Sequence, residues 1–131
     1  MLFFPQIEQL KEVLKAKGFI VFTPSPEGTG VDYSKLSKQE QVDMKKHFID
    51  KHIAKIRESD AILLANYDKN EMKNYIGANT FLEMAFAYIL NKKIFLLQAI
   101  PDQPNAVEIA GLRPIVLEND LGLLEKYMTA I

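Results

Sequence analysis

Short, uninterrupted runs of mainly apolar residues alternate along this chain with longer stretches in which apolar residues recur every three or four positions. The short runs cover residues 19–23, 61–65, 94–97 and 115–117. Such runs are typical of strands that are covered on both faces of a parallel sheet, and the longer stretches are typical of helices. Because the two alternate, the pattern predicts an α/β fold with a mostly parallel sheet and right-handed crossovers.

The helices are predicted from apolar spacing and from signals at their ends. The first helix ends at Gly18, a residue type that is favoured just after a helix C-terminus. Ser37 and Glu40 have the spacing of a capping box, which begins the second helix. The third is apolar nearly all round, so we expect it to be buried against the sheet and against a second subunit. The predicted helices span residues 5–17, 38–58, 80–90 and 120–128, and residues 24–33 and 98–113 are expected to be mostly loop.

The length and the charge balance narrow the choice of partners. A chain of 131 residues is about one average domain, so a single domain over residues 1–131 is expected. Sixteen Lys and Arg residues stand against 17 Asp and Glu residues, which leaves no basic surplus to bind a phosphate backbone. A nucleic-acid polymer is therefore not expected as a partner, whereas a small nucleotide is allowed.

Several chemistries are excluded by what the sequence does not contain. The chain has no Cys, so thiolate nucleophiles and Cys-based zinc sites are absent, and its two His residues do not by themselves make a metal site. No Gly-x-Gly-x-x-Gly occurs, which argues against a dinucleotide cofactor, so no metal and no cofactor are predicted. No apolar stretch approaches the ~18–20 residues needed to span a bilayer, so no membrane partner and a cytoplasmic location are expected.

Ligands of open parallel sheets bind beyond the carboxyl ends of the strands. Three segments meet that criterion here: the one after Thr23, residues 66–77 and residues 98–105, and the second is the most polar. Within it, Asn66 and Asp68 are either turn-forming residues or groups that hydrogen-bond a planar polar ligand, with Asp68 as a proton donor. Tyr67 either stacks on a base or is an ordinary loop tyrosine. Residues 101–105 form either a pocket wall or a rigid turn.

Glu83 is the one charged residue between Lys73 and Lys92, and it falls in the first turn of the predicted third helix. Two interpretations stay open. In one, Thr80 and Glu83 form a capping box and Glu83 accepts a hydrogen bond from the helix backbone. In the other, Glu83 is a catalytic carboxylate that the helix dipole keeps ionised and nucleophilic. A cap would point back to the backbone, whereas a nucleophile would face the ligand.

Three segments together resemble the nucleoside 2-deoxyribosyltransferase superfamily. The family pattern is an acidic residue before a buried strand, a polar loop, a Gly-Thr-x-x-Glu-x-Gly-x-Ala helix start, and a Gly-Lys-Pro turn into the next strand. The corresponding segments are SDAILL at 59–64, GANTFLEMAFA at 77–87 and NKKIF at 91–95. The resemblance implies a flavodoxin-like (Rossmann-like) three-layer sandwich. The family's first strand has no counterpart before Phe3, so this strand is expected to be missing.

The resemblance also implies a chemistry, which acts on the N-glycosidic bond of deoxynucleosides or their monophosphates. Glu83 matches the position of the family nucleophile, which attacks C1′ of the sugar and forms a glycosyl-enzyme ester. Asp68 falls near the family residue that contacts the base and assists its departure. The substrate-binding residues expected from the match and its flanks are Asn66, Tyr67, Gly77, Asn79 and Thr80, although the family carries Asp or Ser where this chain has Gly77.

Two other functions remain open at this point. One is a non-catalytic protein that binds a nucleoside or nucleotide on the same fold, with Glu83 as a hydrogen-bond acceptor or cap. The other is a subunit whose apolar helix, around Phe81 to Leu90, serves assembly alone. In each case we expect a homodimer or a larger homo-oligomer that forms through that helix.

Overall fold

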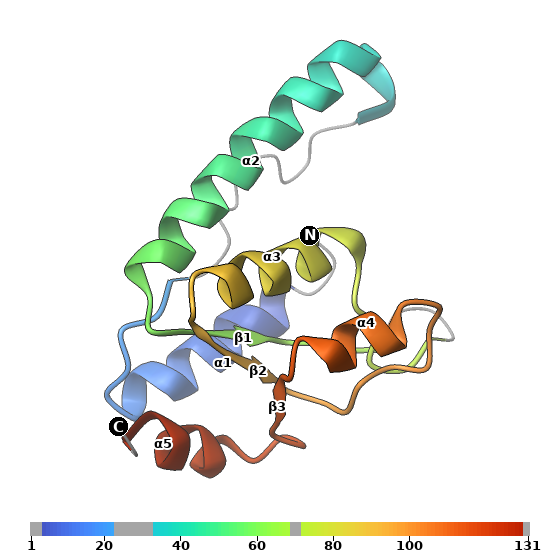
Figure 1. Cartoon of the computed structure of the whole chain (residues 1–131). Helices are drawn as coiled ribbons and strands as arrows, with labels where there is room; N and C mark the ends of the chain where they lie inside the picture. The colour runs from blue at the N-terminus through green and yellow to red at the C-terminus, as the bar shows by residue number, and fades with distance from the viewer. Residues whose placement is uncertain (1–3, 23–32, 69–71, 130–131) are drawn as a thin grey trace. The chain divides into compact units, whose positions relative to one another are not determined.

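The computed structural model describes residues 4–22, 33–68 and 72–129 (Figure 1). Over these ranges the chain forms α-helices and a three-stranded parallel sheet, so the predicted α/β class is confirmed. The chain divides into two compact units, Met1–Lys55 and Ile56–Ile131. The single domain predicted for residues 1–131 stays a prediction.

In the first unit, α1 (Phe4–Ala16) ends as the sequence indicates. Gly18 has a φ of 93°, the left-handed conformation that a residue without a Cβ adopts readily. The Gly18 N–H donates to the Lys15 carbonyl at 3.0 Å, and the Phe19 N–H donates to the Leu14 carbonyl at 3.2 Å. These two bonds are the Schellman motif, which satisfies carbonyls that the helix end would otherwise leave unpaired.

The strand predicted at residues 19–23 is not formed over its described part, residues 19–22, and this prediction is wrong there. The Ile20 side chain is 89% exposed and that of Phe22 is 52% exposed. Apolar and β-branched residues favour strands because they pack on a pleated, half-buried surface, and no described strand pairs with this segment to provide one. Thr23 and the predicted loop that follows it, up to residue 32, lie outside the described residues, and Tyr33–Lys35 (η1) forms a 3₁₀ turn.

The predicted capping box begins α2 (Lys38–Glu58). The Glu40 N–H donates to the Ser37 hydroxyl at 3.1 Å, and the Ser37 N–H donates to the Glu40 carboxylate at 2.9 Å. Because each residue satisfies the other's backbone donor, the first turn of this long helix is fixed by local contacts alone. The helix ends at Glu58, as the sequence predicts.

The capping box makes the start of α2 sensitive to acid. Hydrogen bonds from the Ser37 backbone N–H, and then from its hydroxyl, lower the pKa of Glu40 below its usual value. A lowered pKa in the folded state means that the cap's contribution is complete above the ordinary glutamate pKa and is lost as the pH falls through the lowered one. We expect an NMR titration of the Glu40 carboxyl to show this lowered pKa, with the α2 N-terminus fraying at acid pH. In Ser37→Ala the pKa of Glu40 should rise only part of the way, because the backbone donor remains, and an unchanged wild-type titration at the ordinary glutamate value would contradict the prediction.

The second unit contains the sheet. The strands lie in the order β1-β2-β3 and are all parallel, with Ala61 opposite Lys93 and Phe95 opposite Ile115. Three of the four predicted strands are therefore confirmed. The predicted loop at 98–113 contains a short helix that the sequence analysis missed. The elements are β1 (Ala61–Leu64), α3 (Ala78–Ile89), β2 (Lys93–Leu96), α4 (Ala106–Gly111), β3 (Ile115–Val116) and α5 (Leu121–Thr129).

Both faces of β2 are buried, which explains its continuous apolar sequence. Helices α3 and α4 lie on one face of the sheet and α5 lies on the other (Figure 1). Phe95 is fully buried, and its ring lies 6.1 Å from that of Tyr127 on α5 in an edge-to-face arrangement. The next residue, Leu96, points to the opposite face because side chains alternate along a strand. The core on that side includes Ile56, Leu64, Ile76, Met84, Ala87, Ile94, Leu96 and Ile109.

Candidate functional site

The loops that follow β1 and β2 are joined by the side chain of Asn66, just beyond the carboxyl end of β1. Its amide NH₂ donates to the carbonyls of Asn74 (3.3 Å), Gln98 (3.3 Å) and Ala99 (3.0 Å), and its carbonyl oxygen accepts from the Gln98 N–H at 2.8 Å. The side chain is 2% exposed. Since a buried amide requires such partners, Asn66 fixes the two loops against each other. Both polar atoms of the Asn66 side chain are therefore hydrogen-bonded to backbone groups of the chain.

A second amide, that of Gln103, makes a similar connection. Its side-chain oxygen accepts from the Ile76 N–H at 3.2 Å, and its NH₂ donates to the Ile76 carbonyl at 3.0 Å. Gln103 thereby pairs with Ile76 as a neighbouring strand would. The described parts of residues 66–77 and 98–105, two of the three segments proposed for ligand binding, are thus brought together at one edge of the sheet. Residues 101–105 were singled out in the sequence, but the pairing of Gln103 was not foreseen, because nothing local marks a contact across 27 residues.

Asp68 holds the first of these loops in shape. Its Oδ1 accepts from the Asn74 N–H at 2.9 Å, and Asn74 has a φ of 55°, a left-handed conformation that asparagine tolerates well. The Asp68 side chain is otherwise exposed to solvent. The Tyr75 N–H donates to the Tyr67 carbonyl at 3.1 Å, and partial burial raises the pKa of the Tyr67 hydroxyl. This edge therefore carries the acidic side chain of Asp68 and the phenol of Tyr67, whose neutral form is favoured by burial.

Gly77 links the polar loop to α3. The side chain of Tyr75 lies beside it: a Cβ at Gly77 would be 3.5 Å from the Tyr75 Cε1 and 3.9 Å from its hydroxyl, which are ordinary contacts. With a φ of −76°, Gly77 is in a conformation that any residue adopts. The glycine is therefore required neither by backbone strain nor by a clash, and the Tyr75 ring borders the N-terminus of the helix.

The predicted capping box of Thr80 and Glu83 is wrong, because α3 begins at Ala78 and not at Thr80. Gly77 is the N-cap, no side chain caps the helix, and the Phe81 N–H donates to the Gly77 carbonyl at 2.9 Å. Glu83 is thus the sixth helical residue and lies in the second turn, about 9 Å along the axis from Gly77. This removes the cap interpretation for Glu83. The same shift places Asn79, which is exposed, and Thr80, which is half-buried, in the first turn.

Glu83 occupies one flank of α3. Residues three and four apart on a helix are neighbours, so Glu83 shares this flank with Asn79 before it and Phe86 after it. Glu83 is half-buried, and Phe86 packs against the core. The flank therefore runs from a polar end, near the loops joined by Asn66 and Gln103, to an apolar end. A carboxylate in this position is partly shielded from water, which strengthens its interaction with a charge that develops nearby.

The described ranges contain no group of three or more His, Asp or Glu side chains placed to hold a metal ion. No helix within those ranges is long and apolar enough to cross a membrane. No protein-family model, curated protein or solved structure matches this chain.

Proposed function

We propose that this chain is a nucleoside 2-deoxyribosyltransferase-like domain of flavodoxin-like fold that lacks the first strand of that fold. Its partner is a small nucleoside or nucleotide, bound at the carboxyl edge of the sheet. The observation that carries the proposal is the position of Glu83: a half-buried carboxylate on α3, the helix that follows the polar loop, which the side-chain amides of Asn66 and Gln103 join to the loop after β2. Parallel sheets bind their ligands at this edge.

In the proposed reaction, a Glu83 carboxylate oxygen attacks C1′ of the deoxyribose. The bond between C1′ and the base nitrogen breaks, the electron pair goes to the base, and Asp68 assists by protonating the departing base. An ester between Glu83 and the sugar remains. A nitrogen of a second base, or water, then attacks C1′ and passes its proton to Asp68, while the ester bond breaks and releases the Glu83 carboxylate. Two displacements at one carbon give net retention of configuration.

Each of the other predicted site residues has a place in this scheme. We assign Asn66 a positioning role, because its amide holds both loops from below the surface. Tyr67 lies in the first loop, where its ring would stack on the base. Gly77, Asn79 and Thr80 lead into α3, where backbone N–H groups and short polar side chains would bind sugar hydroxyls.

A base-exchange assay tests the proposal. The full chain is incubated with a 2′-deoxynucleoside and a different free base, and the products are separated by chromatography. We expect either a new deoxynucleoside or, with water as the acceptor, free base and deoxyribose. Glu83 would be found esterified by one deoxyribosyl group in the mass spectrum of a quenched reaction. Neither exchange nor base release from any of the common deoxynucleosides would overturn the catalytic proposal.

A non-catalytic nucleoside-binding protein is the second candidate, and one observation favours it. The Asp68 carboxylate accepts the Asn74 N–H, so one of its oxygens is used to shape the loop rather than left for the base. Calorimetric titration distinguishes the two candidates. Saturable binding of a nucleoside with no turnover supports the binding protein, whereas turnover supports the transferase.

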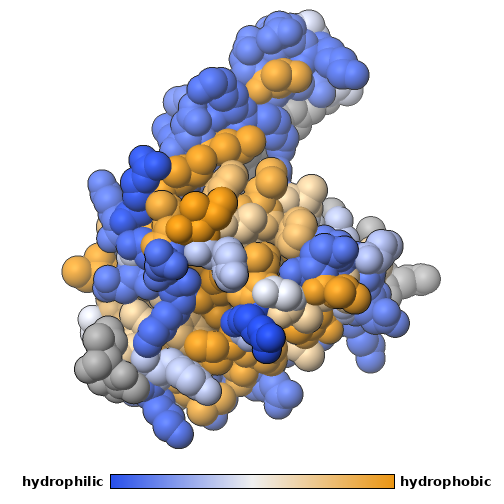
Figure 2. Space-filling view, in the orientation of Figure 1, coloured by the Kyte–Doolittle hydropathy of each residue, from blue (hydrophilic) through white to orange (hydrophobic). Residues whose placement is uncertain are grey.

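We also propose that the chain self-associates through α3. This self-association is the assembly role that the sequence analysis left open. Figure 2 shows apolar surface over this helix, and Ile89 is 74% exposed on it. A dimer that buries Ile89 would be broken by Ile89→Asp, because a carboxylate in an apolar interface is costly to desolvate. We expect sedimentation velocity to show a dimer for the wild type and a monomer for Ile89→Asp. The matched control Val107→Asp, at an 80% exposed residue of α4, should remain dimeric; a wild-type monomer would contradict the prediction.

A further inference from the structure

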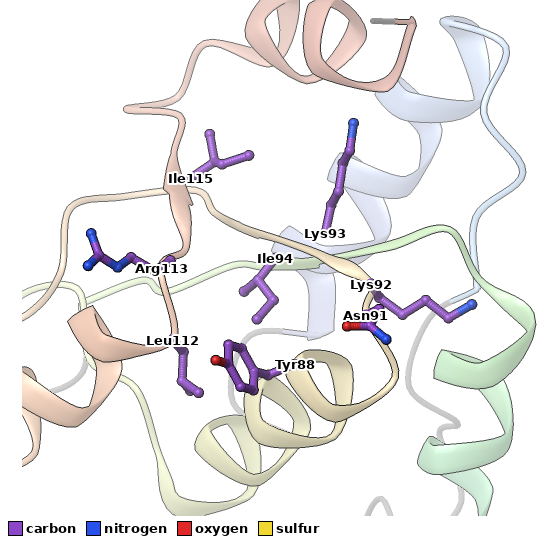
Figure 3. A pocket seen from close by; sticks show the side chains of 8 residues that line it. All are labelled: Tyr88, Asn91, Lys92, Lys93, Ile94, Leu112, Arg113 and Ile115. Atoms are coloured by element: carbon purple, nitrogen blue, oxygen red, sulfur yellow. The ribbon is translucent and has the colours of Figure 1, made fainter. Parts of the chain in front are cut away.

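A hollow of about 430 Å³ opens at the amino ends of β2 and β3, at the opposite edge of the sheet from the candidate site (Figure 3). None of the predicted site residues lines it. It forms where α3 and α4 end and the chain turns into the next strand, and each turn contains a residue with left-handed φ, Asn91 at 58° and Arg113 at 57°. The side chains of Tyr88, Ile94 and Leu112 lie together in Figure 3 and form an apolar wall.

The charged residues that line this hollow are all basic. Its lining includes Lys92, Lys93 and Arg113 and no acidic residue, in a chain whose overall charge is −1. The Lys93 ammonium donates to the Tyr127 carbonyl of α5 at 2.6 Å. In the part of the chain that the structure describes, Lys92 and Arg113 form no ion pair. In Figure 3 they lie on opposite flanks of the apolar wall.

The polar groups of the wall are also available. Across the described ranges, neither the Tyr88 hydroxyl nor the Asn91 side-chain amide has a hydrogen-bond partner. The Tyr88 ring is 55% exposed. A wall with an exposed aromatic ring, two aliphatic side chains and a free amide can contact a flat apolar body and hydrogen-bond its edge.

We propose that this hollow binds a small aromatic anion, with its ring against Tyr88, Ile94 and Leu112 and its carboxylate or phosphate on Lys92 or Arg113. The volume lies within the ~300–1,000 Å³ of small-molecule sites. Lys92 and Arg113 each follow the C-terminus of a helix, where a cation also complements the helix dipole. The helix dipole explains why cations occur at Lys92 and Arg113. It does not explain the hollow or the exposed Tyr88 ring. Because the hollow lies at the opposite edge of the sheet from the candidate site, binding of an anion there does not depend on the proposed transferase activity.

A ligand titration followed by amide NMR tests this inference. Benzoate and phenyl phosphate are the anionic probes, and benzylamine and benzyl alcohol are the cationic and neutral probes of the same ring. We expect saturable shifts of the backbone amides of residues 91–94, 112, 113 and 115 with both anions, and none with benzylamine or benzyl alcohol. The tighter of the two anions identifies whether a carboxylate or a phosphate is preferred.

The double variant Lys92→Gln, Arg113→Gln should weaken anion binding about tenfold or more, because it removes the charge-assisted bonds. Lys38→Gln, in an exposed first turn of α2, is the control and should bind as the wild type does. Arg113 is exposed and Lys92 is half-buried, and neither charge is paired within the described residues, so circular dichroism of the double variant should show an unchanged fold. Equal shifts with benzylamine, unchanged affinity in the double variant, or shifts that map elsewhere would each overturn the inference.

Discussion

Replacing Glu83 by Gln is expected to lower the rate of base exchange by a factor of about 10³ or more, which corresponds to about 4 kcal/mol of transition-state stabilisation. The amide has nearly the shape of the carboxylate but is neutral, so it neither attacks C1′ nor stabilises the positive charge that develops on the sugar. The expected loss is the largest of any substitution in the site. It is measured as the initial rate of exchange between a 2′-deoxynucleoside and a free base.

The control for this variant is Glu108→Gln, which makes the same chemical change at an exposed position of α4. It should exchange bases at the wild-type rate. Calorimetric titration of Glu83→Gln should still show nucleoside binding, because the proposed base contacts lie in the loop after β1. Exchange by Glu83→Gln within a few-fold of the wild-type rate would show that Glu83 is not the nucleophile.

The secondary structure was most predictable where a local signal and the fold agree. The capping box of Ser37 and Glu40 and the C-terminal Gly18 are local, since each depends on residues within a few positions, and both are present. The strands at Ala61–Leu64 and Lys93–Leu96 were predicted because burial on both faces leaves a continuous apolar run. Periodicity and end signals were sufficient for these elements.

The failures occur where tertiary contacts decide. Residues 19–22 have strand-like composition, but composition does not provide the neighbouring strand that a strand requires. The start of α3 was predicted two residues late because Thr80 and Glu83 have the spacing of a capping box, although Gly77 is the N-cap. Helix α4 was missed because six residues are too short for a periodic pattern.

In the candidate site, too, some features could be predicted from the sequence and others could not. The edge of the sheet and its two loops were predictable, because parallel strands place their carboxyl ends together. The roles of Asn66 and Gln103 were not, because their partners are backbone groups about 30 residues away and backbone groups leave no mark in the sequence. From the sequence, an asparagine after a strand could form a turn, contact a ligand or join two loops as a buried residue. Only its burial in the structure identifies the loop-joining role.

Asn66→Ala is therefore expected to lower the free energy of unfolding by about 2–4 kcal/mol. The substitution leaves the Gln98 N–H and the carbonyls around it without the amide, and each buried polar group that loses its partner costs about 1–3 kcal/mol. Urea denaturation followed by circular dichroism measures the loss. Asn79→Ala, at an exposed polar residue in the first turn of α3, is the control and should change stability by less than about 0.5 kcal/mol.

Asn66→Asp distinguishes a structural role of Asn66, in joining the two loops, from a role in ligand binding. The substitution changes the charge of the side chain and keeps its shape. A carboxylate in place of the NH₂ group would face the carbonyl oxygens of Asn74, Gln98 and Ala99, so the folded state would disfavour its ionised form and raise its pKa. A raised pKa means that stability is highest below the ordinary aspartate pKa and is lost as the pH rises through the raised value. The variant should thus be less stable than Asn66→Ala near neutral pH and should recover as the pH falls. If Asn66 served only to contact a ligand, both variants would unfold like the wild type at every pH and differ from it in nucleoside affinity alone.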